Sequence, residues 1–173
     1  MRIKTLLKQS SIFITPFLIL GFASNLSEPS PANAQSYPIT VMIRSNSYPR
    51  LAINAWEGAR HGAELRLHQD CVSSNPDCKW IYRDGMLISA SNPRLAVNAW
   101  EGALHGTVLR LNENCVSSNP DCTWTYQNGM FVSNSNPKLA INAWEGAKHG
   151  TVLRLHRDCV STNPDCTWSR TFK

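Results

Sequence analysis

A phrase of twelve residues occurs three times in this chain, and each copy begins 44 residues after the one before. It reads LAINAWEGARHG from Leu51, LAVNAWEGALHG from Leu95 and LAINAWEGAKHG from Leu139. The same step relates three tryptophans, Trp80, Trp124 and Trp168. Self-similarity with a period of about 20 to 50 residues is typical of architectures in which equivalent units stack around a shared core. The chain is therefore predicted to contain three equivalent units.

Turn-forming residues divide each unit into segments that are too short for a repeat built from paired helices. Gly, Asn-Pro and Asp-Gly or Asn-Gly sequences recur about every ten residues. In the second copy they leave four short runs, at residues 85–89, 95–100, 107–112 and 122–126. In the second run, Leu95, Val97 and Ala99 alternate with Ala96, Asn98 and Trp100, which is the pattern of a strand with one buried face. Four strands in each of three units give twelve predicted strands.

The number of units restricts how these strands can be arranged. Propellers have from about four to eight four-stranded blades, so three units are too few. An open stack of three sheets would expose two edges, which natural proteins avoid. Closing the units around a pseudo-threefold axis removes both edges. We therefore predict an all-β chain that folds as a β-trefoil of three pseudo-equivalent four-stranded repeats, at about residues 38–81, 82–125 and 126–169.

The first 34 residues have the features of a secretory signal peptide. Arg2, Lys4 and Lys8 precede an apolar run at residues 12–23, and Ala32 to Ala34 form a small-residue exit with predicted cleavage after Ala34. The run is shorter than the roughly 20 residues that a membrane-spanning helix needs, so no membrane insertion is expected. We predict export to the extracellular space or periplasm, and a single domain at residues 35–173.

The charge of the exported part is low and dispersed. The formal net charge of the whole chain is +5, and removing three basic residues and Glu28 with the signal peptide lowers it to +3. Because no run of Lys or Arg creates a concentrated basic face, binding to nucleic acid is not expected.

All six cysteines fall in the exported part and follow the repeat, as Cys71 and Cys78, Cys115 and Cys122, and Cys159 and Cys166. An even number in an oxidising compartment indicates disulfides, for which six cysteines allow fifteen pairings. The threefold recurrence favours the three local pairs, because equivalent pairs then have equivalent geometry. Each local pair would close an eight-residue loop and stabilise the fold by about 2.5 kcal/mol. Cysteines seven residues apart do not match a zinc knuckle, so neither a metal nor another cofactor is expected.

The repeated phrases GMLIS, LAVNAW, GTVLRLN and CTW resemble the repeats of the ricin B-type β-trefoil lectins, and the resemblance extends through residues 37–172. In that family each unit ends in a Gln-x-Trp motif whose tryptophan packs in the core. Trp80, Trp124 and Trp168 match this tryptophan and are expected in the core. The chain departs from the family at the glutamine, which is replaced by Cys78, Cys122 and Cys166.

The resemblance also implies positions for a sugar site in each repeat. The family carries an acid or amide on the second strand, and this position is taken by Asn54, Asn98 and Asn142. An aromatic residue near the end of the third strand corresponds to His68 and His156, while the middle copy has Asn112, so the middle site is expected to bind most weakly. Secondary candidates are Asp77, Asp121 and Asp165, which lie where the family can touch the sugar, although Asn-Pro-Asp is also a turn sequence.

Further candidates follow from the strand pattern itself. If the leucines and alanines of the second strand point inward, the asparagines face outward, together with Trp56, Trp100 and Trp144 and with Arg66, Arg110 and Arg154 on the neighbouring strand. An amide, an indole face and a guanidinium on one hairpin suit the hydroxyls and the C–H face of a sugar. The alternatives are that the asparagines cap the hairpin turn, the tryptophans pack against the next unit and the arginines pair with glutamates.

The turn between the second and third strands contains Glu57 and His61, and their copies are Glu101 and His105, and Glu145 and His149. Three histidines related by a threefold axis could meet at a metal, but a solvated hairpin is the simpler interpretation. No catalytic motif stands out, and equivalent carboxylates do not supply the two different environments that acid–base catalysis needs. No enzyme is expected.

The sequence thus favours a secreted, non-enzymatic carbohydrate-binding protein with up to three weak sites that act together on a multivalent glycan. Two other functions stay open. One is a protein-binding trefoil such as a protease inhibitor, which would need one loop unlike the others. The second is a structural module of the cell exterior.

Overall fold

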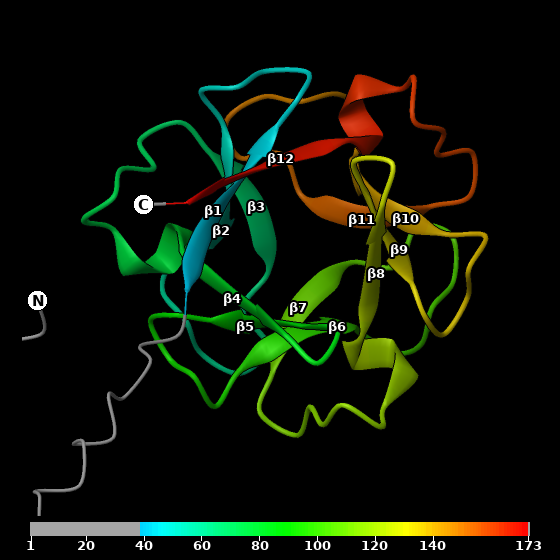
Figure 1. The fold of residues 1–173 in the computed structure, drawn as a ribbon, viewed down its shortest axis with the longest axis horizontal. Coiled ribbons are helices and arrows are strands. Elements are labelled where there is room, and N and C mark those ends of the chain that lie inside the picture. Colours follow the sequence, from blue (N-terminus) through cyan, green and yellow to red (C-terminus); the bar gives the residue numbers. More distant parts are fainter. Residues whose placement is uncertain (1–38, 173) are drawn as a thin grey trace, which may run out of the picture. The chain divides into compact units, whose positions relative to one another are not determined.

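A computed structural model describes residues 39–172, so the predicted signal peptide and its cleavage site lie outside the described residues. Figure 1 shows three similar groups of strands arranged around a common centre. The strands of the first repeat are β1 (Thr40–Ser45), β2 (Ala52–Ala55), β3 (Leu65–His68) and β4 (Trp80–Arg83). Those of the second are β5 (Met86–Ser89), β6 (Ala96–Ala99), β7 (Leu109–Asn112) and β8 (Trp124–Gln127). The third repeat has β9 (Met130–Ser133), β10 (Ala140–Ala143), β11 (Leu153–His156) and β12 (Trp168–Phe172).

The strand pairing is that of a β-trefoil, which confirms the predicted fold. Antiparallel ladders join β1 to β12 and to β4, β4 to β5, and β8 to β9, and backbone hydrogen bonds from Trp124 to Gly85 and from Trp168 to Gly129 link the remaining neighbours of this ring. The hairpins β2–β3, β6–β7 and β10–β11 complete the three repeats. Single bridges connect residues in or beside β3, β7 and β11, so the three hairpins meet at the pseudo-threefold axis.

The core contains one tryptophan from each repeat, as the sequence predicts. Trp80, Trp124 and Trp168 are at most 1% exposed. Each indole Nε1 donates to a backbone oxygen of the second strand of its own repeat: Trp80 to Ile53 at 3.1 Å, Trp124 to Val97 at 3.3 Å and Trp168 to Ile141 at 3.2 Å. The large apolar ring is thus buried without leaving its only polar atom unpaired.

The three disulfides join the local pairs, Cys71–Cys78, Cys115–Cys122 and Cys159–Cys166. Each closes a loop that ends in a one-turn 3-10 helix: η1 (Pro76–Cys78), η2 (Pro120–Cys122) and η3 (Pro164–Cys166). Asn75 caps η1 by accepting a hydrogen bond from the Asp77 amide at 3.0 Å, and the other two loops repeat this cap. No helix in residues 39–172 is long and apolar enough to cross a membrane.

The expectation that the second strand of each repeat has one exposed face is wrong. Every residue of β2, β6 and β10 is buried. The reason is that the disulfide loop packs over the outer face, where Cys78 and Cys71 form a small apolar cluster with Ala52 and Met42. Alternation of apolar and polar residues along a strand therefore predicts an exposed face only when no other segment of the chain packs on that face.

Asn54, Asn98 and Asn142 are therefore not outward-facing, because the same loops cover them. They are only 5%, 6% and 7% exposed. In each repeat the Nδ2 atom donates to the second cysteine of the disulfide, over 3.3 Å to Cys78 Sγ, 3.2 Å to Cys122 Sγ and 3.3 Å to Cys166 Sγ. The asparagine thus fastens the disulfide loop to the strand.

Candidate functional site

A pocket of about 350 Å³ in the first repeat brings four of the five candidates predicted there together. Its lining consists of residues from the end of β2 and the following turn, from the end of β3 and from the η1 loop: Asn54, Ala55, Trp56, Glu57, Gly58, His68, Asn75 and Asp77. Glu57 and Gly58 have φ values of 58° and 95°, so the chain reverses sharply just after Trp56. We call this cavity the first-repeat pocket.

Asp77 supplies the most distinctive atom of the first-repeat pocket. Its Oδ1 is buried and accepts no hydrogen bond from the described residues, and the same holds for Asp121 and Asp165 in the other repeats. Native proteins seldom leave a buried carboxylate oxygen unpaired, because desolvation without a hydrogen bond is costly. An acceptor in this position, repeated three times, suits a ligand that donates hydrogen bonds.

Trp56 is flanked by two histidines from different repeats. The centroid of the Trp56 ring lies 5.7 Å from that of His68 and 5.5 Å from that of His149, and the centroids of the two imidazoles lie 4.8 Å apart. The third repeat reproduces this group with Trp144, His156 and His105. In the middle repeat Asn112 stands at the position of His68 and His156. His61 is therefore the one described aromatic ring that packs on Trp100. Each tryptophan therefore packs against another unit, as in the alternative drawn from the sequence, although its partner is the turn histidine of the preceding unit in the ring rather than of the next.

The turn histidines do not meet around a metal. His61, His105 and His149 each pack on a different tryptophan, and residues 39–172 contain no cluster of three or more His, Cys, Asp or Glu side chains that could hold a metal ion. Nδ1 of His68 accepts a hydrogen bond from the Asp70 amide at 3.0 Å, and Nδ1 of His149 accepts one from the Gln69 amide at 3.4 Å. In the neutral imidazole the hydrogen is then on Nε2, which makes this atom a donor.

The environment of His105 favours the neutral imidazole. Desolvation of the ring is the largest cause that lowers its pKa, followed by the positive charges of Arg157 and His156, while Asp158 acts in the opposite direction. The neutral form, with a hydrogen-bond donor at Nε2, therefore persists to lower pH than for a free histidine.

The arginines lie outside the first-repeat pocket, which corrects the prediction that they share one site with the asparagines. Arg66 Nε and Nη2 donate to Glu64 Oε2 at 3.0 and 2.7 Å, and Arg110 Nη2 donates to Glu64 Oε1 at 2.7 Å. The alternative weighed from the sequence, arginine paired with glutamate, therefore holds for these two residues. Arg154 has no such acid, and its guanidinium lies 5.5 Å from the ring centroid of Trp144.

Glu64 is the single carboxylate of this cluster. Its burial would raise the pKa, but the hydrogen bond from Arg66 and the charges of Arg110 and Arg66 outweigh burial, so the pKa lies below the usual 4.5. A carboxyl with a lowered folded-state pKa contributes stability that is complete above its unfolded pKa and is lost as the pH falls through the folded value.

Glu64→Gln is expected to lower the free energy of unfolding by about 1 to 2 kcal/mol at neutral pH, because three charge-assisted hydrogen bonds from Arg66 and Arg110 are weakened at a partly exposed site. The difference from wild type should shrink as the pH falls from about 4.5, where the unfolded chain takes up the proton, through the lower pKa that Glu64 has in the folded chain. Urea unfolding at a series of pH values measures it. Glu101→Gln is the control, since Glu101 forms no ion pair with the described residues. Parallel pH curves for wild type and Glu64→Gln would contradict the assignment.

Several known proteins share this fold at low sequence identity. No protein-family model and no curated protein sequence matches the chain. The C-half of the earthworm R-type lectin, solved in complex with GalNAc, aligns with a TM-score of 0.66 and 13% identity over 79% of this chain and 100% of that one. The β-trefoil lectin of the Vibrio vulnificus hemolysin/cytolysin, solved with N-acetyl-D-lactosamine, aligns with a TM-score of 0.60 and 12% identity over 80% of this chain and 97% of that one. The designed threefold-symmetric protein ThreeFoil aligns with a TM-score of 0.63 and 12% identity over 76% of this chain and 96% of that one. The chain thus has the β-trefoil fold, and its structural neighbours include R-type lectins.

Proposed function

We propose that this chain is a secreted, non-enzymatic lectin that binds carbohydrate in the first-repeat pocket and in the equivalent positions of the other two repeats. The observation that carries the proposal is the buried, unpaired Oδ1 of Asp77 in a pocket that also contains an indole and an imidazole. Support also comes from the neighbours that were solved with sugars bound.

Each side chain of the first-repeat pocket has a part in this proposal. Asp77 accepts a hydrogen bond from a sugar hydroxyl, and His68 donates one through Nε2. Trp56 offers an apolar ring to the C–H face of the sugar. Asn54 holds the η1 loop through its hydrogen bond to Cys78 Sγ, and so positions Asp77.

Three copies give the protein a use for weak sites. The candidate residues of the second repeat are Asn98, Trp100, Asn112 and Asp121, and those of the third are Asn142, Trp144, His156 and Asp165. A glycan that engages two or three sites at once can bind about 10² to 10⁴ times more tightly than at one site. The middle site lacks the imidazole donor and is expected to contribute least.

Replacing Asp77, Asp121 and Asp165 together by asparagine is expected to abolish detectable glycan binding. Each single change removes a charged acceptor while keeping the side-chain volume, and should weaken its site by about 10- to 100-fold. A glycan array with the mature protein, followed by calorimetry on the best ligand, measures the effect. The matched control is Asp70→Asn combined with Asp158→Asn, because both aspartates are exposed and the middle repeat already has Asn114 at this position.

Two outcomes would count against the proposal in different ways. Unchanged binding by the triple variant would show that the sugar lies elsewhere on the protein. Failure of the wild-type protein to bind any glycan would reject carbohydrate binding itself and favour a protein-binding or structural trefoil.

A further inference from the structure

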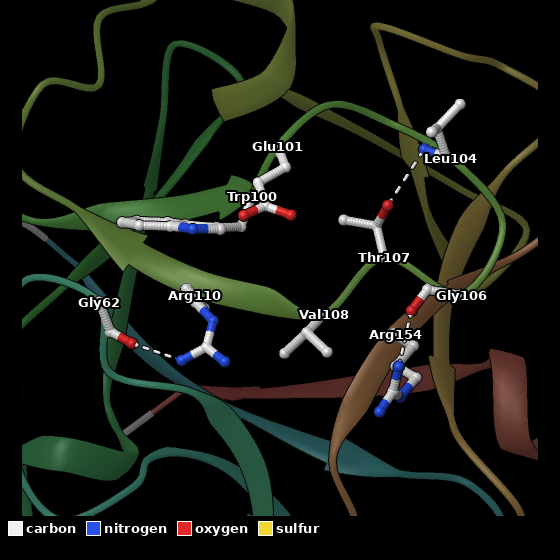
Figure 2. Close-up of a pocket in the computed structure, with 9 residues that line it drawn as sticks. All are labelled: Gly62, Trp100, Glu101, Leu104, Gly106, Thr107, Val108, Arg110 and Arg154. Carbon is white, nitrogen blue, oxygen red and sulfur yellow. Dashed lines mark hydrogen bonds between the residues drawn. The ribbon is translucent and has the colours of Figure 1, made fainter.

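A second kind of groove lies beside each of the first two hairpins, and it shares only the tryptophan and the glutamate of the turn with the proposed sugar pocket. The groove of the first repeat is lined by Trp56, Glu57, Arg60, Gly62, Ala63, Glu64, Arg66 and Arg110. The groove of the second repeat, drawn in Figure 2, is lined by the residues 44 positions later, Trp100, Glu101, Leu104, Gly106, Thr107, Val108, Arg110 and Arg154, and also by Gly62. The two grooves are therefore copies of one feature.

The two copies differ at three positions, where Leu104, Thr107 and Val108 stand in place of Arg60, Ala63 and Glu64, and the last difference lies between the arginines. Glu64 stands between Arg66 and Arg110 in the first groove, and Val108 takes its place between Arg110 and Arg154 in the second. The volumes differ accordingly, at about 220 Å³ for the first groove and about 460 Å³ for the second. The second groove is thus larger and has no carboxylate where the first has one.

Arg154 gives the second groove a positive end. Its Nη1 donates to the Gly106 carbonyl at 2.9 Å, it forms no ion pair with a described carboxylate, and its Nε donates to no described atom. Arg110 is partly neutralised, since its Nη2 contacts Glu64 and its Nη1 donates to the Gly62 carbonyl at 2.9 Å. Uncompensated positive charge is therefore concentrated at Arg154.

Trp100 gives the second groove an apolar end. The guanidinium of Arg66 lies 5.3 Å from the centroid of Trp56, and that of Arg154 lies 5.5 Å from Trp144. No guanidinium among the described residues covers Trp100 in this way, and Arg110 contacts Glu64 and the Gly62 carbonyl instead. Figure 2 shows Trp100 and Glu101 at one end of the groove, Arg154 at the other and Val108 between them.

We propose that the second-repeat groove binds an acidic sugar, with a carboxylate or sulfate group at Arg154 and Arg110 and the sugar ring against Trp100. A guanidinium pairs with either anion through charge-assisted hydrogen bonds. Glu101 repels the anion from the tryptophan end, which fixes the direction of the ligand. That a sugar carries the anion rests on the proposed lectin function, whereas the anion site rests on the groove alone.

The test is built on the chain's own first repeat. Val108→Glu places a carboxylate between Arg110 and Arg154, as Glu64 stands between Arg66 and Arg110, so the variant is expected to fold. The probes are a disaccharide ending in glucuronate, its counterpart ending in glucose, the glucose counterpart sulfated at C6, and inorganic sulfate, each measured by calorimetry or by NMR titration.

We expect both acidic disaccharides to bind the wild-type protein about tenfold more tightly than the neutral one, and Val108→Glu to remove this preference. Raising the ionic strength from about 0.05 to about 0.5 M should also reduce it, because the charges are partly exposed. Val116→Glu is the matched control, since Val116 is 55% exposed on the disulfide loop of the same repeat. It should retain the preference.

Equal binding of acidic and neutral disaccharides would overturn the groove proposal, as would a preference that survives Val108→Glu or disappears in Val116→Glu. Binding of inorganic sulfate alone, without the acidic disaccharides, would also overturn it, because the sugar ring would then have no part. Acidic binding that is lost in Val108→Glu, in a protein that binds no neutral glycan, would support the groove while rejecting the sugar pockets.

Discussion

Reduction of the three disulfides is expected to lower the free energy of unfolding by about 7.5 kcal/mol, the sum of about 2.5 kcal/mol for each eight-residue loop. Natural domains are stable by only about 5 to 15 kcal/mol, so the reduced protein should be largely unfolded at 37 °C. The structure shows why the loops matter beyond chain entropy. Cys78, Cys122 and Cys166 are fully buried, and each holds the loop that covers the outer face of a second strand.

Thermal unfolding followed by circular dichroism, with and without a thiol reductant, measures this effect, and thiol labelling verifies that reduction is complete. Replacing Cys115 and Cys122 together by serine serves as the comparison, because it removes one loop and should cost about 2 to 5 kcal/mol. An unchanged midpoint in the fully reduced protein would mean that packing alone retains the loops.

Trp124→Ala is expected to destabilise the domain by about 3 to 5 kcal/mol, since it leaves a large cavity in the core. The change also removes the hydrogen bond from Nε1 to the Val97 carbonyl, which stays buried in the strand. Trp124→Phe should be milder, because the ring is partly retained although the hydrogen bond is lost. Urea unfolding gives the free energies.

Trp100→Ala is the control within the same repeat, because Trp100 is only partly buried and belongs to the surface grooves. It should cost clearly less than Trp124→Ala. Equal losses for the two variants would contradict the assignment of Trp124 to the core and of Trp100 to a binding surface.

The fold was predictable because its evidence is local and repeated three times. A constant step of 44 residues, short runs between turn signals and three cysteine pairs define the repeat, its strands and its disulfides. The core position of Trp80, Trp124 and Trp168 was predicted from their match to the Gln-x-Trp motif of the family that the repeats resemble.

The candidate site was predictable only in part, because it depends on contacts between distant segments. Asn54 was expected to face outward, but the disulfide loop, which reaches the strand from more than twenty residues away, covers it. His149 packs on Trp56 from another repeat, and a pattern within one repeat cannot show this. Glu64 was not predicted, because the other two repeats have Val108 and Val152 at its position and the repeated pattern therefore gives no sign of it.

The ladder between β1 and β12 has a consequence for how the domain assembles. These strands pair over five residues, from Val41 with Phe172 to Ser45 with Trp168, and Thr171 Oγ1 donates to the carbonyl of Met42 across 129 positions. Because closing so long a loop costs entropy before any contact repays it, we expect this step to come late in folding. Although the three units look modular, the first and the third each complete an edge strand only when β1 pairs with β12, so we expect the ring to gain its stability on closure.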